Sequence, residues 1–146
     1  MLRGNYAAKI DDKGRLKIPN AFRALIEKQH GTELFVTSLT GEYVRIYPMP
    51  VWLEVEQKLA QMPSTHPSKL RFLDRVNYFG QSGEIDTQGR VVIHQRLRDA
   101  AAMAGDVDVL GSVDRLEVWN HDRLVARMLG EPFTDDDAKA LSDFGI

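Results

Sequence analysis

The stretch IDDKGRLKI at residues 10–18 recurs as IDTQGRVVI at residues 85–93, 75 positions further along the chain. Both copies share the pattern I-D-x-x-G-R-x-x-I, and an arginine, Arg23 or Arg98, follows each copy after five residues. An internal repeat is typical of an architecture assembled from similar units. The sequence therefore predicts two copies of one small structural unit.

Each copy of the motif predicts a tight β-hairpin. Residues 5–10 and 15–18 alternate between apolar and polar side chains, as strands with one buried face do. An Asp at the first turn position can accept hydrogen bonds from the backbone ahead of it, and a Gly at the last position tolerates a left-handed conformation. The residues expected to specify the two hairpins are Asp11, Gly14, Asp86, Gly89 and Arg90.

The remaining segments repeat in the same order in both halves. Helical spacing and caps predict helices at 20–30 (capped by Asn20), 50–62, 68–79, 97–104 and after Asn120. In the helix at 68–79, Leu70, Leu73 and Val76 are expected to face inward. Apolar runs predict strands at 34–36, 43–47, 107–110 and 116–119. The unit is β-β-α-β-β-α, present twice, in a β-rich mixed α+β fold.

Chain length argues that the two halves share one core. A chain of 146 residues has the size of a single compact domain, whereas a half of about 70 residues would be marginally stable alone. We expect a first repeat at 1–62, a linker helix at 63–80, a second repeat at 81–130 and an acidic tail at 131–146. We expect this tail to be short and mobile.

Composition narrows the classes of function. The chain has no Cys, so disulfides, thiolate zinc sites and thiol catalysis are excluded. No serine elbow or phosphate-binding Gly loop appears, the four His are widely spaced, and the Asp run at 135–137 is most simply a solvated tail. We therefore expect no enzyme, metal, cofactor or small-molecule substrate. Without a membrane-length apolar stretch or a signal peptide, we expect a cytoplasmic protein with no membrane partner.

The charge differs between the two ends of the chain and between the two copies of the motif. Residues 1–30 carry seven Lys and Arg against three acids, whereas residues 131–146 carry five acids and one Lys. In the first hairpin the outward positions are all cationic: Lys9, Lys13, Arg15 and Lys17. Their counterparts in the second are Glu84, Gln88, Arg90 and Val92. Folding does not require this difference, which favours a first copy specialised for a polyanion such as DNA.

A purely structural interpretation is open for part of this pattern. Arg15 can form an ion pair with Asp11 across the hairpin, and Arg90 can do the same with Asp86. Since the arginine persists in both copies, the three lysines are the clearer indicators of binding. A basic stripe on the 68–79 helix, composed of Lys69, Arg71 and Arg75, is equally compatible with phosphate contact and with a solvated helix face. Trp52, Trp119 and Tyr47 lie on apolar faces and are expected to pack in the core.

The combination of motifs resembles the MraZ family, in the wider group of SpoVT-AbrB or swapped-hairpin domains. The similarity is carried by MLRGNY at 1–6, by IDxxGRLxIP at 10–19 with Phe22-Arg23, by YPMPxW at 47–52 and by DxxGR at 86–90. It extends to about residue 129. One departure is His94, at a position where Pro often follows the second hairpin.

This resemblance implies two tandem swapped-hairpin repeats interleaved into one β-barrel-like core with peripheral helices. It also implies a homo-oligomeric ring that binds short tandem repeats of double-stranded DNA in the promoter of the cell-division and cell-wall gene cluster. We therefore expect a nucleoid-associated, sequence-specific regulator that represses by blocking polymerase. The residues expected to contact DNA are Arg3, Lys9, Lys13, Arg15 and Lys17. The alternative is an AbrB-like antitoxin or protein-interaction module that neutralises a partner protein, binding it through the tail.

Overall fold

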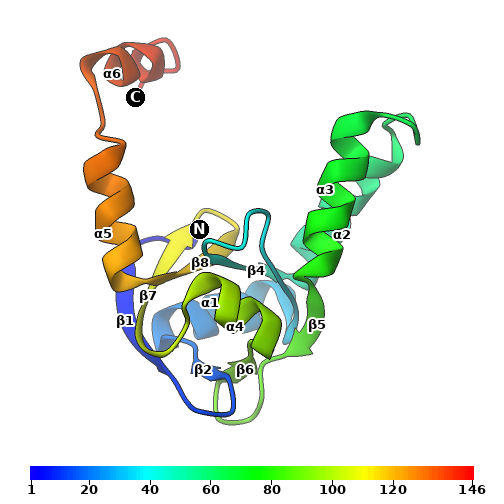
Figure 1. Ribbon diagram of the computed structural model, residues 1–146, viewed down its shortest axis with the longest axis vertical. Coiled ribbons are helices and arrows are strands. Elements are labelled where there is room, and N and C mark those ends of the chain that lie inside the picture. The colour runs from blue at the N-terminus through cyan, green and yellow to red at the C-terminus, as the bar shows by residue number, and fades with distance from the viewer.

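The computed structural model describes residues 1–146 and contains eight strands and six helices (Figure 1). The first half contains β1 (Asn5–Ile10), β2 (Arg15–Lys17), α1 (Asn20–His30), β3 (Glu33–Thr37), β4 (Val44–Pro48) and α2 (Met49–Ala60). The α3 helix (Pro67–Tyr78) follows. The second half contains β5 (Gln81–Glu84), β6 (Arg90–Val92), α4 (Gln95–Ala101), β7 (Gly105–Ser112), β8 (Arg115–Asn120) and α5 (His121–Gly130). The last element is α6 (Asp135–Ser142).

All eight strands form one antiparallel sheet in the order β5-β3-β4-β8-β7-β1-β2-β6. The two edges approach each other, because a Cβ added to Gly83 of β5 would lie 3.5 Å from Cγ2 of Val91 in β6. The sheet is therefore a nearly closed barrel. This confirms the β-rich mixed α+β fold with a barrel-like core.

The two halves are interleaved. β1 of the first half pairs with β7 of the second half, and the equivalent pair is β5 of the second half with β3 of the first. β2 pairs with β6 across an approximate two-fold axis. Under the same two-fold relation, the contact between the edge strands β5 and β6 is the counterpart of the β1–β2 pair. Only β1 and β2 form a ladder, however, through Ile10 and Leu16. In the second copy the turn is kept and β5 pairs with β3, but no ladder forms between β5 and β6.

Equivalent positions of the two halves form one shared core. Leu16, Ile18 and Phe22 are buried, and so are their counterparts at 91, 93 and 97. All six belong to a single cluster of 20 buried residues. The structure thus explains why neither half needs a core of its own. The predicted core positions of Tyr47, Trp52 and Trp119 are also confirmed.

Two local predictions, the Asn20 cap and the inward-facing Leu70, need correction. Pro19 occupies the N-cap position of α1, so Asn20 lies within the helix and its side chain caps nothing, whereas Asn120 does cap α5 by accepting from the Arg123 N–H. Leu70 is 48% exposed because α3 packs chiefly through Phe72 and Val76. In the tail, Thr134 and Asp137 form a reciprocal capping box that begins α6, a helix that the sequence did not predict. On α5, Leu124 is buried, whereas Met128 and Leu129 are exposed.

Two helical arms project from one end of the barrel (Figure 1). One arm consists of α2 and α3, and the other of α5 and α6. The turns that precede β2 and β6 lie at the opposite end of the molecule. This arrangement separates the basic hairpin from the acidic tail.

Candidate nucleic-acid interface

The turn of the first hairpin is organised by one carboxylate. Asp11 Oδ1 accepts hydrogen bonds from the backbone N–H groups of Lys13 at 3.0 Å and Arg15 at 2.9 Å. Its Oδ2 pairs with Nε of Arg15 at 2.6 Å. Gly14 closes the turn with a φ of +82°. The backbone N–H of Arg15, followed by its guanidinium, lowers the pKa of Asp11 because these donors stabilise the charged carboxylate.

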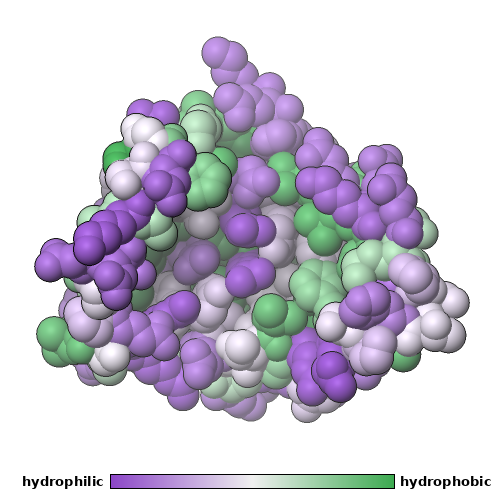
Figure 2. Space-filling view, turned by 90° about the horizontal axis from the view of Figure 1, so that it is seen from above, coloured by the Kyte–Doolittle hydropathy of each residue, from purple (hydrophilic) through white to green (hydrophobic).

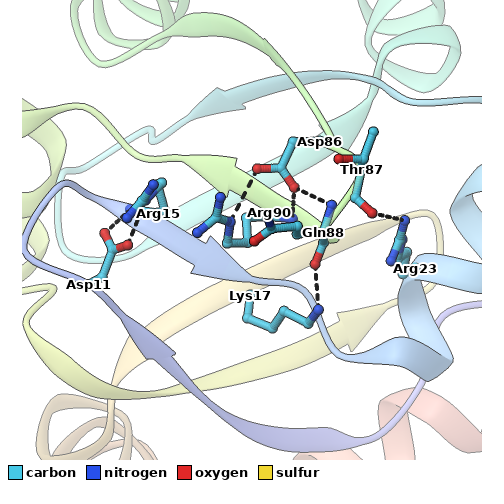
Figure 3. A network of polar contacts seen from close by, with 8 residues as sticks. All are labelled: Asp11, Arg15, Lys17, Arg23, Asp86, Thr87, Gln88 and Arg90. Atoms are coloured by element: carbon cyan, nitrogen blue, oxygen red, sulfur yellow. Dashed lines mark hydrogen bonds and ion pairs between the residues drawn. The ribbon is translucent and has the colours of Figure 1, made fainter.

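The second turn has the same geometry (Figure 3). Asp86 accepts from the backbone of Gln88 and Arg90, and its Oδ2 pairs with Arg90 Nε at 3.2 Å. Gly89 has a φ of +78°. The backbone N–H of Arg90 is the main cause of the lowered pKa of Asp86. Both ion pairs considered from the sequence are therefore present, and in each the arginine commits only its Nε to the aspartate.

The two turns are tied to each other across the approximate two-fold axis. The Ile18 N–H donates to the Gly89 carbonyl at 2.9 Å, and the Ile93 N–H donates to the Gly14 carbonyl at 2.8 Å. Each arginine that follows a motif reaches over the turn of the other copy. Arg23 Nη2 donates to the Thr87 carbonyl at 3.3 Å (Figure 3), and Arg98 Nη1 to the Asp12 carbonyl at 3.5 Å. Sequence reasoning recorded these arginines without assigning them a role, although their repetition was the available signal.

Four of the five predicted contact residues lie on or beside the first hairpin. Lys9, Lys13 and Lys17 are exposed, and Arg15 is partly exposed. Lys17 Nζ donates to the backbone carbonyl of Gln88 in the other turn (Figure 3). Lys9 Nζ lies 4.0 Å from Asp106, but both side chains are 83% exposed, so this pair is weak. The lysine ammonium groups therefore remain accessible to a ligand.

The second copy adds a cation to this surface. In the β2–β6 pair, Lys17 lies opposite Arg90, and Arg15 lies opposite Val92, whose side chain is 55% exposed. We refer to the surface formed by Lys9, Lys13, Arg15, Lys17 and Arg90 as the basic face. It spans both hairpins, although the sequence analysis expected DNA contacts from the first copy alone. Pairing of β2 with β6 is what brings Arg90 into it.

Arg3 does not join the basic face. Leu2 forms a β-bridge with Val113, and the Gly4 carbonyl accepts from the Gly111 N–H, which places Arg3 at the end of β1 remote from the turn. The six residues of β1 span roughly 20 Å at about 3.3 Å per residue.

The basic stripe of α3 also lies apart, on the α2–α3 arm. Lys69 Nζ donates to the Met62 carbonyl and Arg75 Nη1 to the Arg71 carbonyl, so both side chains serve their own arm.

No three of the His, Asp and Glu side chains come together in an arrangement that could hold a metal ion. His94, the departure from the family pattern, donates from its Nε2 to the Phe79 carbonyl at 2.7 Å and so ties α4 to the end of α3. None of the six helices has the length and apolar character needed to cross a bilayer.

Comparison with known proteins identifies the family. Residues 1–75 and 81–144 match the family model described as "MraZ protein, putative antitoxin-like". The chain is 48% identical to the transcriptional regulator MraZ of Acidobacterium capsulatum over 146 residues and 46% identical to that of Koribacter versatilis over 147, with both chains covered in full. It is 37% identical to the same regulator of Leuconostoc citreum, with 99% of each chain covered. The two matched segments coincide with the two interleaved halves, and the chain belongs to the MraZ family of transcriptional regulators, which are not enzymes.

Proposed function

We propose that the protein binds double-stranded promoter DNA through the basic face and regulates transcription by occupying tandem short repeats. The observation that carries this proposal is the convergence of five cations from two hairpins on one exposed surface, with Lys17 and Arg90 directly paired. Lys and Arg on a two-stranded ribbon are suited to phosphate contact and to reading of base edges in a groove.

The local geometry favours binding over a purely structural role for the lysines. Continuing the Ile10–Leu16 register by one residue puts Lys9 opposite Lys17. Like charges directly opposite each other on neighbouring strands destabilise a sheet, so folding alone does not favour this pair. A polyanion that lies across both strands removes the repulsion.

The acids that pair with the two arginines of the basic face leave part of each guanidinium free. Asp11 and Asp86 are engaged by the backbone and by one nitrogen of Arg15 or Arg90. No hydrogen bond within the chain uses the terminal Nη nitrogens of these two arginines, so Nη1 and Nη2 of each arginine are available for a phosphate or for a guanine edge. The aspartates therefore orient the guanidinium groups.

A single face of this size supports only modest affinity, so assembly is part of the proposal. Several copies in a homo-oligomeric ring would present several basic faces to tandem repeats and gain affinity through effective concentration. Occupancy of the promoter of the division and cell-wall gene cluster would then exclude polymerase and repress transcription. Such a protein would act in the cytoplasm on the nucleoid.

The direct test is the salt dependence of binding to a tandem-repeat duplex, measured by fluorescence anisotropy. Replacing Lys13→Ala or Lys17→Ala removes one phosphate contact, so the slope of log K against log salt falls by about 0.9 per contact. Gln88→Ala changes the position equivalent to Lys13 in the second hairpin and leaves affinity and slope unchanged. Unchanged binding in both lysine variants refutes the proposal.

The alternative role as an antitoxin-like module predicts a different outcome. A partner protein captured at stoichiometric amounts, together with no mobility shift on any promoter duplex, would favour it. Binding to the partner would then be unaffected by Lys13→Ala and Lys17→Ala.

A further inference from the structure

The end of the barrel remote from the basic face holds a second concentration of arginine. An open groove of about 950 Å³ lies between the outer face of β4 and β8, the β3–β4 loop and α5. We call it the arginine groove and define it by Tyr43, Trp119, Arg45, Arg123 and Arg127. Figure 2, which looks down on the two arms, shows the molecule hollowed between them, with hydrophilic residues in the hollow.

The floor of the groove is a rigid aromatic stack. The rings of Tyr43 and Trp119 lie 4.3 Å apart at an angle of 9°, and both residues are buried. The Arg127 guanidinium lies 5.1 Å from the Trp119 ring and 5.6 Å from the Tyr43 ring. Arg45 lies 5.6 Å from the Tyr43 ring. Stacked aromatic rings therefore hold the guanidinium groups in fixed positions.

Most of this positive charge has no carboxylate partner within the chain. Arg45 donates to the hydroxyls of Tyr43 and Tyr47, and Arg123 donates to two backbone carbonyls. Glu117, which lies opposite Arg45 in the sheet, accepts from the Trp119 indole instead of pairing with it. Burial opposes the charged form of Arg45, but the two tyrosyl hydroxyls outweigh it and raise the pKa above its ordinary value.

Two other carboxylates line the groove, Glu42 and Glu131, and only Glu131 forms an ion pair, with Arg127 at 3.4 Å. Arg45 and Arg123 thus stay charged and unpaired, which is the chemistry of a site for an acidic ligand.

The chain carries a segment with the complementary properties. Residues 131–146 contain five acids and one Lys, and α6 within them begins with Asp135, Asp136 and Asp137. Acids in the first turn and a capping box favour this helix. A helix of eight residues is nevertheless marginal without packing, and none of its residues is buried. Phe133, Leu141, Phe144 and Ile146 are all exposed.

From these observations we infer that the acidic tail, residues 131–146, of one copy docks in the arginine groove of a second copy. The aspartates of the tail would pair with Arg45 and Arg123, which have no carboxylate partner, and the apolar side chains would cover exposed parts of α5. The tail projects beyond α5, away from its own barrel, and so is presented to a neighbour (Figure 1).

Because each chain carries both a tail and a groove, docking of the tail of one copy in the groove of the next is a head-to-tail contact. Such contacts close into a ring when the rotation between copies permits. The inference thus deepens the assembly part of the proposed function and gives the tail a partner.

The test is assembly measured without DNA, by native mass spectrometry and sedimentation. The tail variant Phe144→Ser/Ile146→Ser changes side chains that are 83% and 81% exposed, so folding is unaffected. The groove variant Arg127→Glu reverses one groove charge, and its fold is checked by circular dichroism. Each variant alone is expected to be monomeric. An equimolar mixture retains one intact tail and one intact groove per pair, and is expected to give a species at twice the 16.5 kDa of one chain.

Matched controls change residues of the other arm. Arg71→Glu and Leu70→Ser lie on α3, outside the groove, and are expected to assemble like the unmodified chain. Assembly that survives the tail variant, or that is lost with Leu70→Ser but kept with Arg127→Glu, overturns the inference. A monomeric unmodified chain does so as well.

Failure of DNA binding is distinguishable, because Lys13→Ala leaves the assembled mass unchanged. The tail variant would instead keep its affinity for a single repeat and lose the enhancement on tandem repeats, which is about 100-fold or more for linked sites.

Discussion

Replacing Gly14 by Ala is expected to destabilise the protein, because the new Cβ would clash with the second half of the chain where the two turns meet. Gly14 has a φ of +82°, where a Cβ costs about 1–2 kcal/mol. The added Cβ would also lie 2.5 Å from the Ile93 carbonyl and 2.7 Å from Nε of Arg98. The carbonyl belongs to the backbone, so relief requires a backbone shift that strains the Ile93–Gly14 hydrogen bond. Overpacking of this kind costs about 1–3 kcal/mol more, for a total of about 2–5 kcal/mol.

Substitutions at two other glycines distinguish the conformational cost of a positive φ from the cost of the steric clash. Gly105 also has a positive φ, +67°, but a Cβ there meets no atom within 4 Å, so Gly105→Ala is expected to cost only the conformational term of about 1–2 kcal/mol. At Gly89 the nearest atom is Nη1 of Arg23 at 2.9 Å, the far end of a flexible side chain that can move aside. Gly89→Ala is therefore expected to fall between the other two.

Urea unfolding followed by tryptophan fluorescence measures the three free energies, since Trp52 and Trp119 are buried. The expected order of destabilisation is Gly14→Ala, then Gly89→Ala, then Gly105→Ala. If Gly14→Ala and Gly105→Ala agree within about 0.5 kcal/mol, the cross-turn contact contributes nothing and the reasoning fails.

Three further predictions follow from particular residues. Val92→Lys places a cation opposite Arg15 at the counterpart of Lys17, so DNA binding is expected to tighten at low salt and the salt slope to rise by about 0.9; an unchanged slope in anisotropy titrations would contradict the location of the basic face. The hydrogen bond and charge of Asp108 raise the pKa of His121 above 6.5, so this pair stabilises the fold fully below that pH and loses its effect as the pH rises through the raised pKa. The urea midpoint should therefore fall as the pH rises above 6.5 in the unmodified chain but not in His121→Gln, and parallel curves would refute the assignment. A chain ending at Gly130 should unfold at the same urea concentration as the monomeric tail variant Phe144→Ser/Ile146→Ser, because no residue beyond Leu124 is buried; a lower midpoint would show that the tail packs on its own barrel.

The assignment of cations to the basic face shows where sequence reasoning reached its limit. Lys9, Lys13 and Lys17 were identified because alternation in a strand specifies which side chains face outward. Arg90 was assigned only a structural role in the second hairpin, since a comparison of the hairpins position by position treats each hairpin as separate. Arg3 was grouped with the lysines because it is near them in the sequence, although the length of β1 carries it to the other end of the barrel.

The tail illustrates a different limit. Its acidity was evident from composition, and its helix was not predicted, because a capping box at Thr134 followed by only eight helical residues is a weak local signal. The arginine groove was equally hidden, since Arg45 is far in the sequence from Arg123 and Arg127, and the three converge only through packing of α5 against β8.

The sequence by itself determined the local features: the turns at Asp11–Gly14 and Asp86–Gly89, the buried face of each strand, the duplication and the family. These depend on short-range chemistry, in which each turn residue and each alternating side chain acts within a few positions. Only the tertiary structure decided which strands pair, so that β2 meets β6 and each turn is held by the other half's arginine. Alternation specifies the face that a strand buries but not its neighbour, because the partner is chosen by packing between segments about 75 residues apart.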